Sequence, residues 1–448
     1  MTLKISRILH AGYLFECEET KIAFDPIFEN PFSRNCHAFP NVKFDHDQIK
    51  QLKLNAVFIS HYHDDHCSLE SLNLLDRQTP VYVYCLFDEL FEFIRTLGFA
   101  QVIPLTIDAP VNIGGLEVIT RRALDSDVDS MFQIRAKGVN VLNVVDSSID
   151  PATLKQLSRY APWDMVLWPF QTMREIEVIA PSRAAPAPGH LPEEWIAQLK
   201  RLNPRYVVPS SCQFVQESWS WYNNAFFPIS YHLFKNEVES ALPESSVIRL
   251  NPGVSVLLEK DGLEMSFPLP WIQPIGEQNL DYEYDPHLRP PSTAELSRHF
   301  AALTAEQTSR VIDYCRSGLL KKYRSLEHPE SEYFETLRHW QLSVYDHAGI
   351  GSHFYYRITG NDIVLLSERV EPIGWLTEVS AAKLYAALES GETLTSMYMR
   401  INDRVFEPEI EAEIQEADIV DDPLIRCLFN GVFGAYQIDQ LKRLGLRS

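Results

Sequence analysis

A short apolar run at positions 56–59 predicts a buried strand. The run stops at Ser60, and four potential metal ligands follow within six residues, namely His61, His63, Asp65 and His66. His61 and His63 lie two positions apart at a strand end, so their side chains can point the same way while the later pair faces a second ion. Imidazole and carboxylate donors without a thiolate suit zinc, iron or manganese. We therefore predict a metal site; the alternative is a polar loop that is merely rich in histidine.

The hydrophobic pattern around this stretch predicts alternating strands and helices up to about residue 150. Strands are expected over residues 3–27 and 81–84, and helices over residues 47–54, 69–76 and 87–97. Such alternation is typical of an α/β sandwich.

A second predicted hairpin ends in a carboxylate. Residues 130–134 and 139–145 have the composition of strands, joined by a turn at Lys137-Gly138, and Asp146 follows directly. A carboxylate at the end of a buried strand is costly unless it is paired or binds metal. We predict that Asp146 is a metal ligand; the alternative is a plain strand-end cap.

Taken together, these motifs resemble a known family. The motif Ser60-His61-x-His63-x-Asp65-His66 resembles the signature motif of the metallo-β-lactamase fold. The segments at residues 10–16 and 21–26 resemble the first hairpin of that fold. The resemblance is to the branch with the lactonases, the N-acylphosphatidylethanolamine phospholipases and the sialic-acid hydroxylases. It implies an αββα sandwich with the metal site at one edge of its sheets, and an Asp146 that bridges two ions.

Two histidines of the family's pattern are missing here. Where the third metal histidine is expected, the chain offers Asp125, with Asp127 as a second candidate. Where the family's last metal histidine is expected, the chain has Ser210, which is a poor metal ligand, with Cys212 nearby. Carboxylate replacement would favour iron or manganese over zinc. The alternative is that one metal position is lost and that these acids are solvated.

A further histidine is a candidate for the active site. Residues 181–189 form a Pro/Ala-rich loop that leads to His190, just before a predicted helix start at Pro192. His190 could be a metal ligand, a proton donor or a substrate contact, and we predict an active-site role for it.

In detail, the chain is most similar to the metallo-β-lactamase-like part of the CMP-N-acetylneuraminate hydroxylases. The similarity extends over residues 5–262 and is clearest at residues 141–146, 192–198 and 202–205. Those hydroxylases also lack the last histidine, but they carry a Rieske iron–sulfur domain. No Cys-x-His pair occurs here, so we expect no Rieske centre within this polypeptide.

The remainder of the chain predicts a second domain. Six prolines between residues 263 and 293 suggest a linker, and Ser292-x-x-Glu295 and Thr304-x-x-Gln307 are capping boxes that open helices. A hairpin is expected over residues 354–366, a helix over 380–388, and a solvated helix face over the acidic run 407–422. We predict a catalytic domain at 1–262, a linker at 263–293 and an α+β domain at 294–448, which could form a homodimer surface or close the pocket.

Charge and cysteine usage limit the partners. The net charge is -21, which argues against nucleic acid and anionic membranes as partners. Seven dispersed cysteines favour a reducing cytoplasm, and the sequence shows neither a signal peptide nor a transmembrane-length apolar run.

These features favour a metal-dependent hydrolase that uses one or two divalent ions. Water activated by the metal would attack a small-molecule ester, lactone, amide or phosphoester, with Asp65 as ligand or proton shuttle and His190 as proton donor. One alternative is an iron oxygenase acting on a nucleotide sugar or natural-product intermediate, with electrons from a separate ferredoxin. The other is a degenerate, non-catalytic member of the family.

Overall fold

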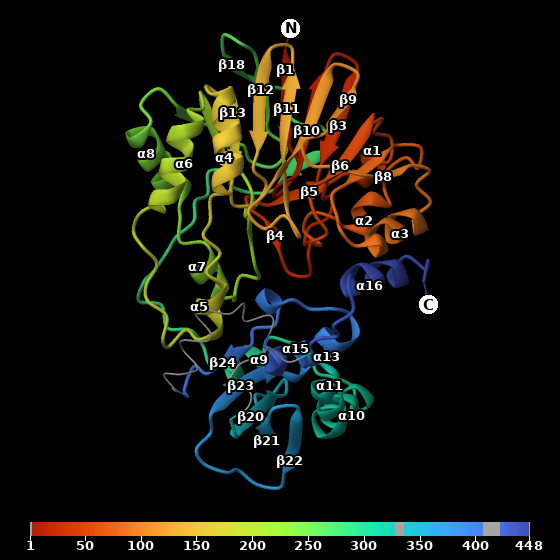
Figure 1. The fold of residues 1–448 in the computed structure, drawn as a ribbon, viewed down its shortest axis with the longest axis vertical. Coiled ribbons are helices and arrows are strands. Elements are labelled where there is room, and N and C mark those ends of the chain that lie inside the picture. The colour runs from red at the N-terminus through yellow and green to blue at the C-terminus, as the bar shows by residue number, and fades with distance from the viewer. Residues whose placement is uncertain (1, 328–335, 406–421, 448) are drawn as a thin grey trace. The chain divides into compact units, whose positions relative to one another are not determined.

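The computed structural model describes residues 2–327, 336–405 and 422–447, which form two compact units (Figure 1). Unit 1 comprises Met1–Thr172, Ala187–Tyr284 and Gln440–Ser448, and unit 2 comprises Met173–Pro186 and Asp285–Asp439. The chain therefore passes between the units more than once, whereas the sequence predicts boundaries only at residues 262 and 294.

The first sheet of unit 1 has eight strands in the order β18-β17-β1-β2-β3-β6-β7-β8. Its strands β18, β17, β1, β2 and β3 pair antiparallel, and β3, β6, β7 and β8 pair parallel. The bounds are β1 Leu3–Arg7, β2 Tyr13–Cys17, β3 Thr20–Phe24, β6 Ala56–Ile59, β7 Val81–Val83, β8 Val102–Pro104, β17 Ser255–Leu258 and β18 Leu263–Ser266.

The second sheet of unit 1 has seven strands in the order β16-β14-β13-β12-β11-β10-β9. The bounds are β9 Pro110–Ile113, β10 Leu116–Arg122, β11 Ser130–Ala136, β12 Val139–Asn143, β13 Met165–Trp168, β14 Tyr206–Pro209 and β16 Ser246–Val247. The predicted hairpin before Asp146 is confirmed, because β11 and β12 pair antiparallel.

The two sheets pack face to face around one hydrophobic core to which both contribute. Phe24 of the first sheet and Phe132 of the second have ring centroids 5.1 Å apart. Three helices labelled here lie beside the first sheet and three beside the second (Figure 1). These are α1 His46–Ile49, α2 Leu69–Leu72 and α3 Asp88–Thr96, and then α4 Pro151–Leu157, α6 Glu193–Leu202 and α8 Tyr231–Ala241. The predicted αββα order is thus the architecture of unit 1.

Part of the predicted linker belongs to unit 1. Strand β18 lies at the edge of the first sheet, and β19 (Ile272–Pro274) pairs with β5 (Val42–Phe44). The remaining small elements of unit 1 are β4 (His37–Ala38), which pairs with β15 (Phe214–Val215), α7 (Tyr222–Phe226) and the 3-10 turn η1 (Ser158–Tyr160).

Unit 2 is an α+β domain, as predicted. Its sheet has the order β22-β21-β20-β23-β24, with bounds β20 Arg338–Tyr345, β21 Gly351–Thr359, β22 Asp362–Leu366, β23 Trp375–Ser380 and β24 Arg400–Ile401. Its helices are α5 Glu175–Ile179, α9 Thr293–Ser297, α10 Ala305–Asp313, the π-helix η2 Tyr314–Gly318, α11 Leu319–Ser325, α13 Ala381–Glu389, the 3-10 turn η3 Leu394–Ser396 and α15 Pro423–Arg426. Helix α16 (Ala435–Arg443) begins in unit 2 and ends in unit 1.

Local sequence signals in unit 2 are confirmed. Both capping boxes are formed at α9 and α10, and β21 and β22 form the predicted hairpin. The acidic run expected over residues 407–422 lies outside the described residues apart from Asp422. Among the described residues, no helix combines the length and the apolar character needed to cross a membrane.

Candidate metal centre

The predicted ligand loop follows β6 and folds back on itself. The backbone N–H groups of His66 and Cys67 both donate to the carbonyl of His63, at 3.1 and 2.7 Å. This turn brings the histidines together, with the side chains of His61 and His66 fully buried and that of His63 exposed. The loop lies at the carboxyl end of a parallel strand, where functional groups of α/β sheets gather.

One group of potential ligands consists of His61, His63 and Asp129, whose donor atoms lie within 4.8 Å of one another. The Nε2 of His61 lies 2.9 Å from Nδ1 of His63 and 3.7 Å from Oδ1 of Asp129. Ser130, next to Asp129, donates its hydroxyl to the carbonyl of Ser60 at 2.7 Å. This bond joins the start of β11 to the ligand loop and so places Asp129 beside His61.

A second group consists of His10, Asp65, His66 and Asp146, whose donor atoms also lie within 4.8 Å of one another. The Nε2 of His66 lies 3.0 Å from Oδ2 of Asp146, 3.1 Å from Nε2 of His10 and 3.7 Å from Oδ2 of Asp65. His10 lies in the turn after β1, so this group draws on three separate stretches of the chain.

Asp146 faces both groups. Its Oδ2 contacts His66 as above, and its Oδ1 lies 4.0 Å from Nε2 of His61. The preceding Val145 has a φ of +64°, which is unusual for a β-branched residue and redirects the chain after β12. Asp146 thus lies where a carboxylate could bridge two ions.

A buried carboxylate sets the tautomers of two histidines. The Oδ2 of Asp25 accepts hydrogen bonds from Ser60 Oγ at 2.6 Å and from His66 Nδ1 at 3.0 Å. Because the Ser60 hydroxyl donates to Asp25, it accepts from Nδ1 of His61, which lies 2.9 Å away. Both histidines therefore carry a proton on Nδ1 and direct Nε2 into the site, which is the orientation in which a neutral histidine binds metal.

His10 has the opposite arrangement. Its Nδ1 accepts a hydrogen bond from the backbone N–H of Cys212 at 3.0 Å, so the proton of the neutral ring sits on Nε2. That nitrogen lies 3.2 Å from Oδ2 of Asp65. His10 is thus arranged to donate to Asp65 rather than to bind an ion.

Asp125 and Asp127 do not join either group, and both are exposed. The carbonyl of Asp125 accepts from the N–H of Asp129 at 2.8 Å, which closes a turn. This turn advances the chain by four residues before β11 begins, so Asp129 takes the place that the sequence assigns to Asp125.

The expected position of the last histidine is also filled differently. Ser210 is buried with its Oγ 3.0 Å from the hydroxyl of Tyr13, and neither Ser210 nor Cys212 belongs to a ligand group. The buried guanidinium of Arg7 donates to the carbonyls of Pro209, at 2.7 Å, and of Ser210 and His10. Arg7 therefore joins the ends of β1 and β14, and His10, in the turn after β1, reaches the site.

His190 lies outside both groups. Its side chain is 86% exposed, and its Nδ1 pairs with Oε1 of Glu237 at 2.8 Å. His190 has no part in the mechanism proposed below.

The charges of the site favour a bound cation. Burial lowers the pKa of His66, but the carboxylates of Asp146 and Asp65 outweigh it and hold that pKa well above its usual value. Burial and the charge of His66 hold the pKa of His61 well below its usual value. Burial and the carboxylate of Asp146 raise the pKa of Asp129 to about 7.

The residues present fit a metal ion. Among the described residues, Oδ1 of Asp129 and Oδ1 of Asp146 are buried and accept no hydrogen bond. Such oxygens are rare in folded proteins unless an ion or water satisfies them. Imidazole and carboxylate donors together suit zinc, iron and manganese.

No protein-family model matches the chain, and no curated protein sequence matches it. Solved structures with a similar fold include Igni18, a metallo hydrolase from Ignicoccus hospitalis, at 21% identity and a TM-score of 0.40 over 58% of this chain and 99% of that one. The metallo-β-lactamase fold protein YhfI from Bacillus subtilis is 13% identical, with a TM-score of 0.38 over 57% and 100%. The diiron β-hydroxylase CmlA from Streptomyces venezuelae is 16% identical, with a TM-score of 0.38 over 58% and 54%.

Proposed function

We propose that the chain is a metal-dependent hydrolase whose two ligand groups hold a pair of divalent ions. The observation that supports this most is the position of Asp146, which directs one oxygen toward His66 and the other toward His61. Under this proposal His61, His63 and Asp129 would hold one ion, Asp65 and His66 would hold the other, and Asp146 would serve both.

A divalent ion at such a site polarises a substrate oxygen and lowers the pKa of water. The protein's own groups then position and move the proton. Asp65, oriented by the Nε2–H of His10, takes the proton from the attacking water as its oxygen bonds to the acyl carbon or phosphorus. Asp65 returns that proton to the leaving oxygen or nitrogen as the scissile bond breaks. Ester, lactone, amide and phosphoester bonds all fit this scheme.

The proposal is tested by reconstitution. Protein stripped with a chelator is reloaded separately with zinc, manganese or iron and assayed against panels of esters, lactones, amides and phosphoesters. We expect activity only after reloading, and its loss in His61→Ala and Asp146→Ala. The matched control is His190→Ala, which removes a histidine outside both groups and should keep full activity. Equal activity in stripped and reloaded protein would overturn the proposal.

The abundance of carboxylates supports one second candidate, an iron-dependent oxygenase supplied with electrons by a separate ferredoxin. Asp65, Asp129 and Asp146 make the donor set harder than one built from histidines alone, which favours iron or manganese. Iron in the purified protein with an optical band that bleaches on reduction would favour this candidate. The closer resemblance to the CMP-N-acetylneuraminate hydroxylases stays a prediction.

A further inference from the structure

We propose that Gln440, near the end of the chain, is a positioning residue for the metal-binding loop. Its side chain is 1% exposed, and both ends of its amide are engaged. The Oε1 accepts from the backbone N–H of Leu69 at 3.0 Å, and the Nε2 donates to Oγ of Ser68 at 3.0 Å. Ser68 follows His66 by two residues. The inference rests on the proposed function, because it assumes that the loop binds metal.

The two partners of Gln440 begin the helix that follows the ligand loop. Ser68 is the N-cap of α2, and its Oγ accepts from the N–H of Ser71 at 3.2 Å. The N–H of Leu69, in the first turn, has no partner within the helix. The Gln440 side chain supplies that partner, so the loop's exit is held by a residue 371 positions away.

The same point is tied to the segment that carries Asp25. Ser68 Oγ donates to Glu29, and Ser71 Oγ donates to Glu29 at 3.1 Å. Ser71 Oγ also accepts from the N–H of Phe28 at 2.8 Å. Glu29 follows Asp25 by four residues. Gln440 therefore acts where the two segments that make the Asp25–His66 hydrogen bond are joined.

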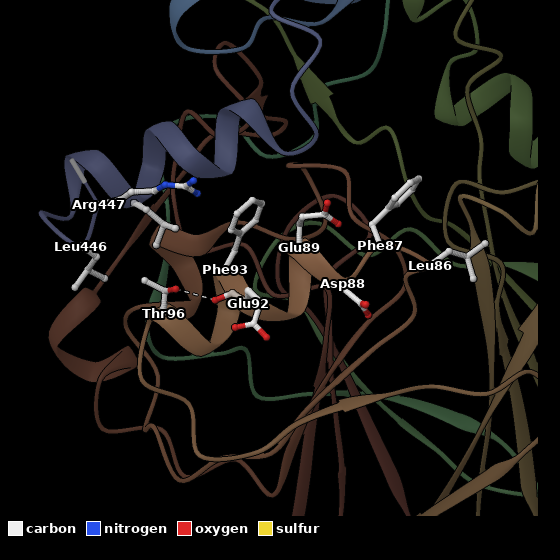
Figure 2. Close-up of a pocket in the computed structure, with 10 residues that line it drawn as sticks. Leu86, Phe87, Asp88, Glu89, Glu92, Phe93, Thr96, Leu446 and Arg447 are labelled. Atoms are coloured by element: carbon white, nitrogen blue, oxygen red, sulfur yellow. Dashed lines mark hydrogen bonds between the residues drawn. The ribbon is translucent and has the colours of Figure 1, made fainter.

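Gln440 is itself held by other contacts of the C-terminal segment. Arg443 makes two hydrogen bonds to the carboxylate of Glu70, at 2.9 and 3.1 Å. The guanidinium of Arg447 lies 5.7 Å from the ring centroid of Phe93 on α3. Leu446 and Arg447 line a cavity of about 810 Å³ together with residues of α3. Figure 2 shows both residues beside that helix. The end of the chain is thus docked independently of Ser68 and can hold the loop.

Loss of the Gln440 amide would leave the buried N–H of Leu69 without its partner and would remove one of the hydrogen bonds of the Ser68 hydroxyl. The loop could then relax, and the Nε2 of His66 would be held less firmly. Residues that orient metal ligands directly change metal affinity by about 10- to 100-fold. Gln440 contacts the residues that follow the ligand loop and not a ligand itself, so we expect metal binding to weaken by only about 3- to 10-fold.

The test measures Co²⁺ binding to the full-length protein. Gln440→Leu keeps the side-chain volume and removes both hydrogen bonds. It should weaken Co²⁺ binding by about 3- to 10-fold and alter the visible absorption band of the bound ion. Gln440→Glu is a second variant, because a carboxylate still accepts from Leu69 but cannot donate to Ser68. It should shift the affinity in the same direction by less.

The matched control is Leu441→Ala, which removes packing from the neighbouring position of the same helix. It should lower the melting temperature and leave the Co²⁺ affinity and absorption band unchanged. If both Gln440 variants keep the wild-type Co²⁺ affinity and absorption band, the inference is wrong but the proposed function stands. The same holds if Leu441→Ala changes the Co²⁺ affinity as much as the Gln440 variants do. Wild-type protein that binds no Co²⁺ would overturn the proposed function and the inference together.

Discussion

The carboxylate of Asp25 and the imidazole of His66 are joined by a 3.0 Å hydrogen bond between two side chains that are 0% exposed. The same oxygen of Asp25 accepts from Ser60, which in turn fixes His61. One buried carboxylate therefore turns the Nε2 atoms of two histidines into the site, although we assign no ion to Asp25 itself.

Asp25→Asn should weaken metal binding by about 10- to 100-fold, the range found for groups that orient metal-bound histidines. An amide oxygen in the place of Oδ2 leaves the NH2 group facing the backbone N–H of Ser60, which donates to Oδ1 of Asp25 at 2.7 Å, so two donors would meet. Competition with a chelator measures the change in dissociation constant. Asp125→Asn, an exposed aspartate outside both groups, is the control. Equal affinities in the two variants would contradict the role of Asp25.

Asp129→Asn should remove one ion per chain, whereas Asp125→Asn should leave the metal content unchanged. The reason is the turn closed by the carbonyl of Asp125, which brings Asp129 and not Asp125 to His61. Elemental analysis of the two purified variants decides between them. Retention of all metal in Asp129→Asn would argue that the first group is not a binding site.

His10→Gln should keep the full metal content and lower kcat by about 10- to 100-fold, less than the roughly 100- to 10,000-fold contribution of a direct acid–base group, because His10 only orients Asp65. His10 presents N–H, not a lone pair, to Asp65, so its removal should disturb proton transfer more than metal binding. Elemental analysis alongside steady-state kinetics separates these effects. Loss of one ion from His10→Gln would show instead that His10 is a ligand.

Glu29 predicts a pH dependence of stability. Burial raises the pKa of Glu29 to about 7, with a further contribution from Glu70 and partial compensation by Ser68 and Ser71. A carboxyl whose pKa is raised by folding stabilises the protein most below its unfolded value, near 4.5, and this stabilisation is lost as the pH rises through about 7. Relative to wild type, Glu29→Gln should therefore gain about 2 to 3 kcal/mol between about pH 5 and pH 8.

Thermal unfolding in excess chelator, with both proteins metal-free, measures this difference without interference from the metal. Glu89→Gln, an exposed position on α3, is the control and should follow wild type at every pH. Parallel melting curves for wild type and Glu29→Gln across the whole range would contradict the assignment.

Much of unit 1 follows from local patterns in the sequence. The apolar run before His61 and the alternation of strands and helices predict the sheets, and the capping boxes predict the starts of α9 and α10. The spacing of His61, His63, Asp65 and His66 and the strand-end position of Asp146 predict residues that the structure brings together. All of these signals are short-range.

The rest depends on contacts between distant segments. His10 reaches the site because Arg7 binds carbonyls at the end of β14, and Asp129 replaces Asp125 because a turn shifts the register by four residues. A helical pattern after His190 predicts where α6 begins but not that this histidine faces solvent. Asp25 directly follows a buried strand, and this is the same kind of sequence signal that predicts a functional role for Asp146.

The most direct test of the account is the metal content of the purified protein after growth with zinc, manganese and iron supplied. The account predicts about two ions per chain in the wild type and a loss of metal in Asp146→Ala, because one carboxylate serves both groups. A wild-type protein that purifies without metal and takes up none on reloading would contradict it, and would leave the two histidine–aspartate groups without the role proposed here.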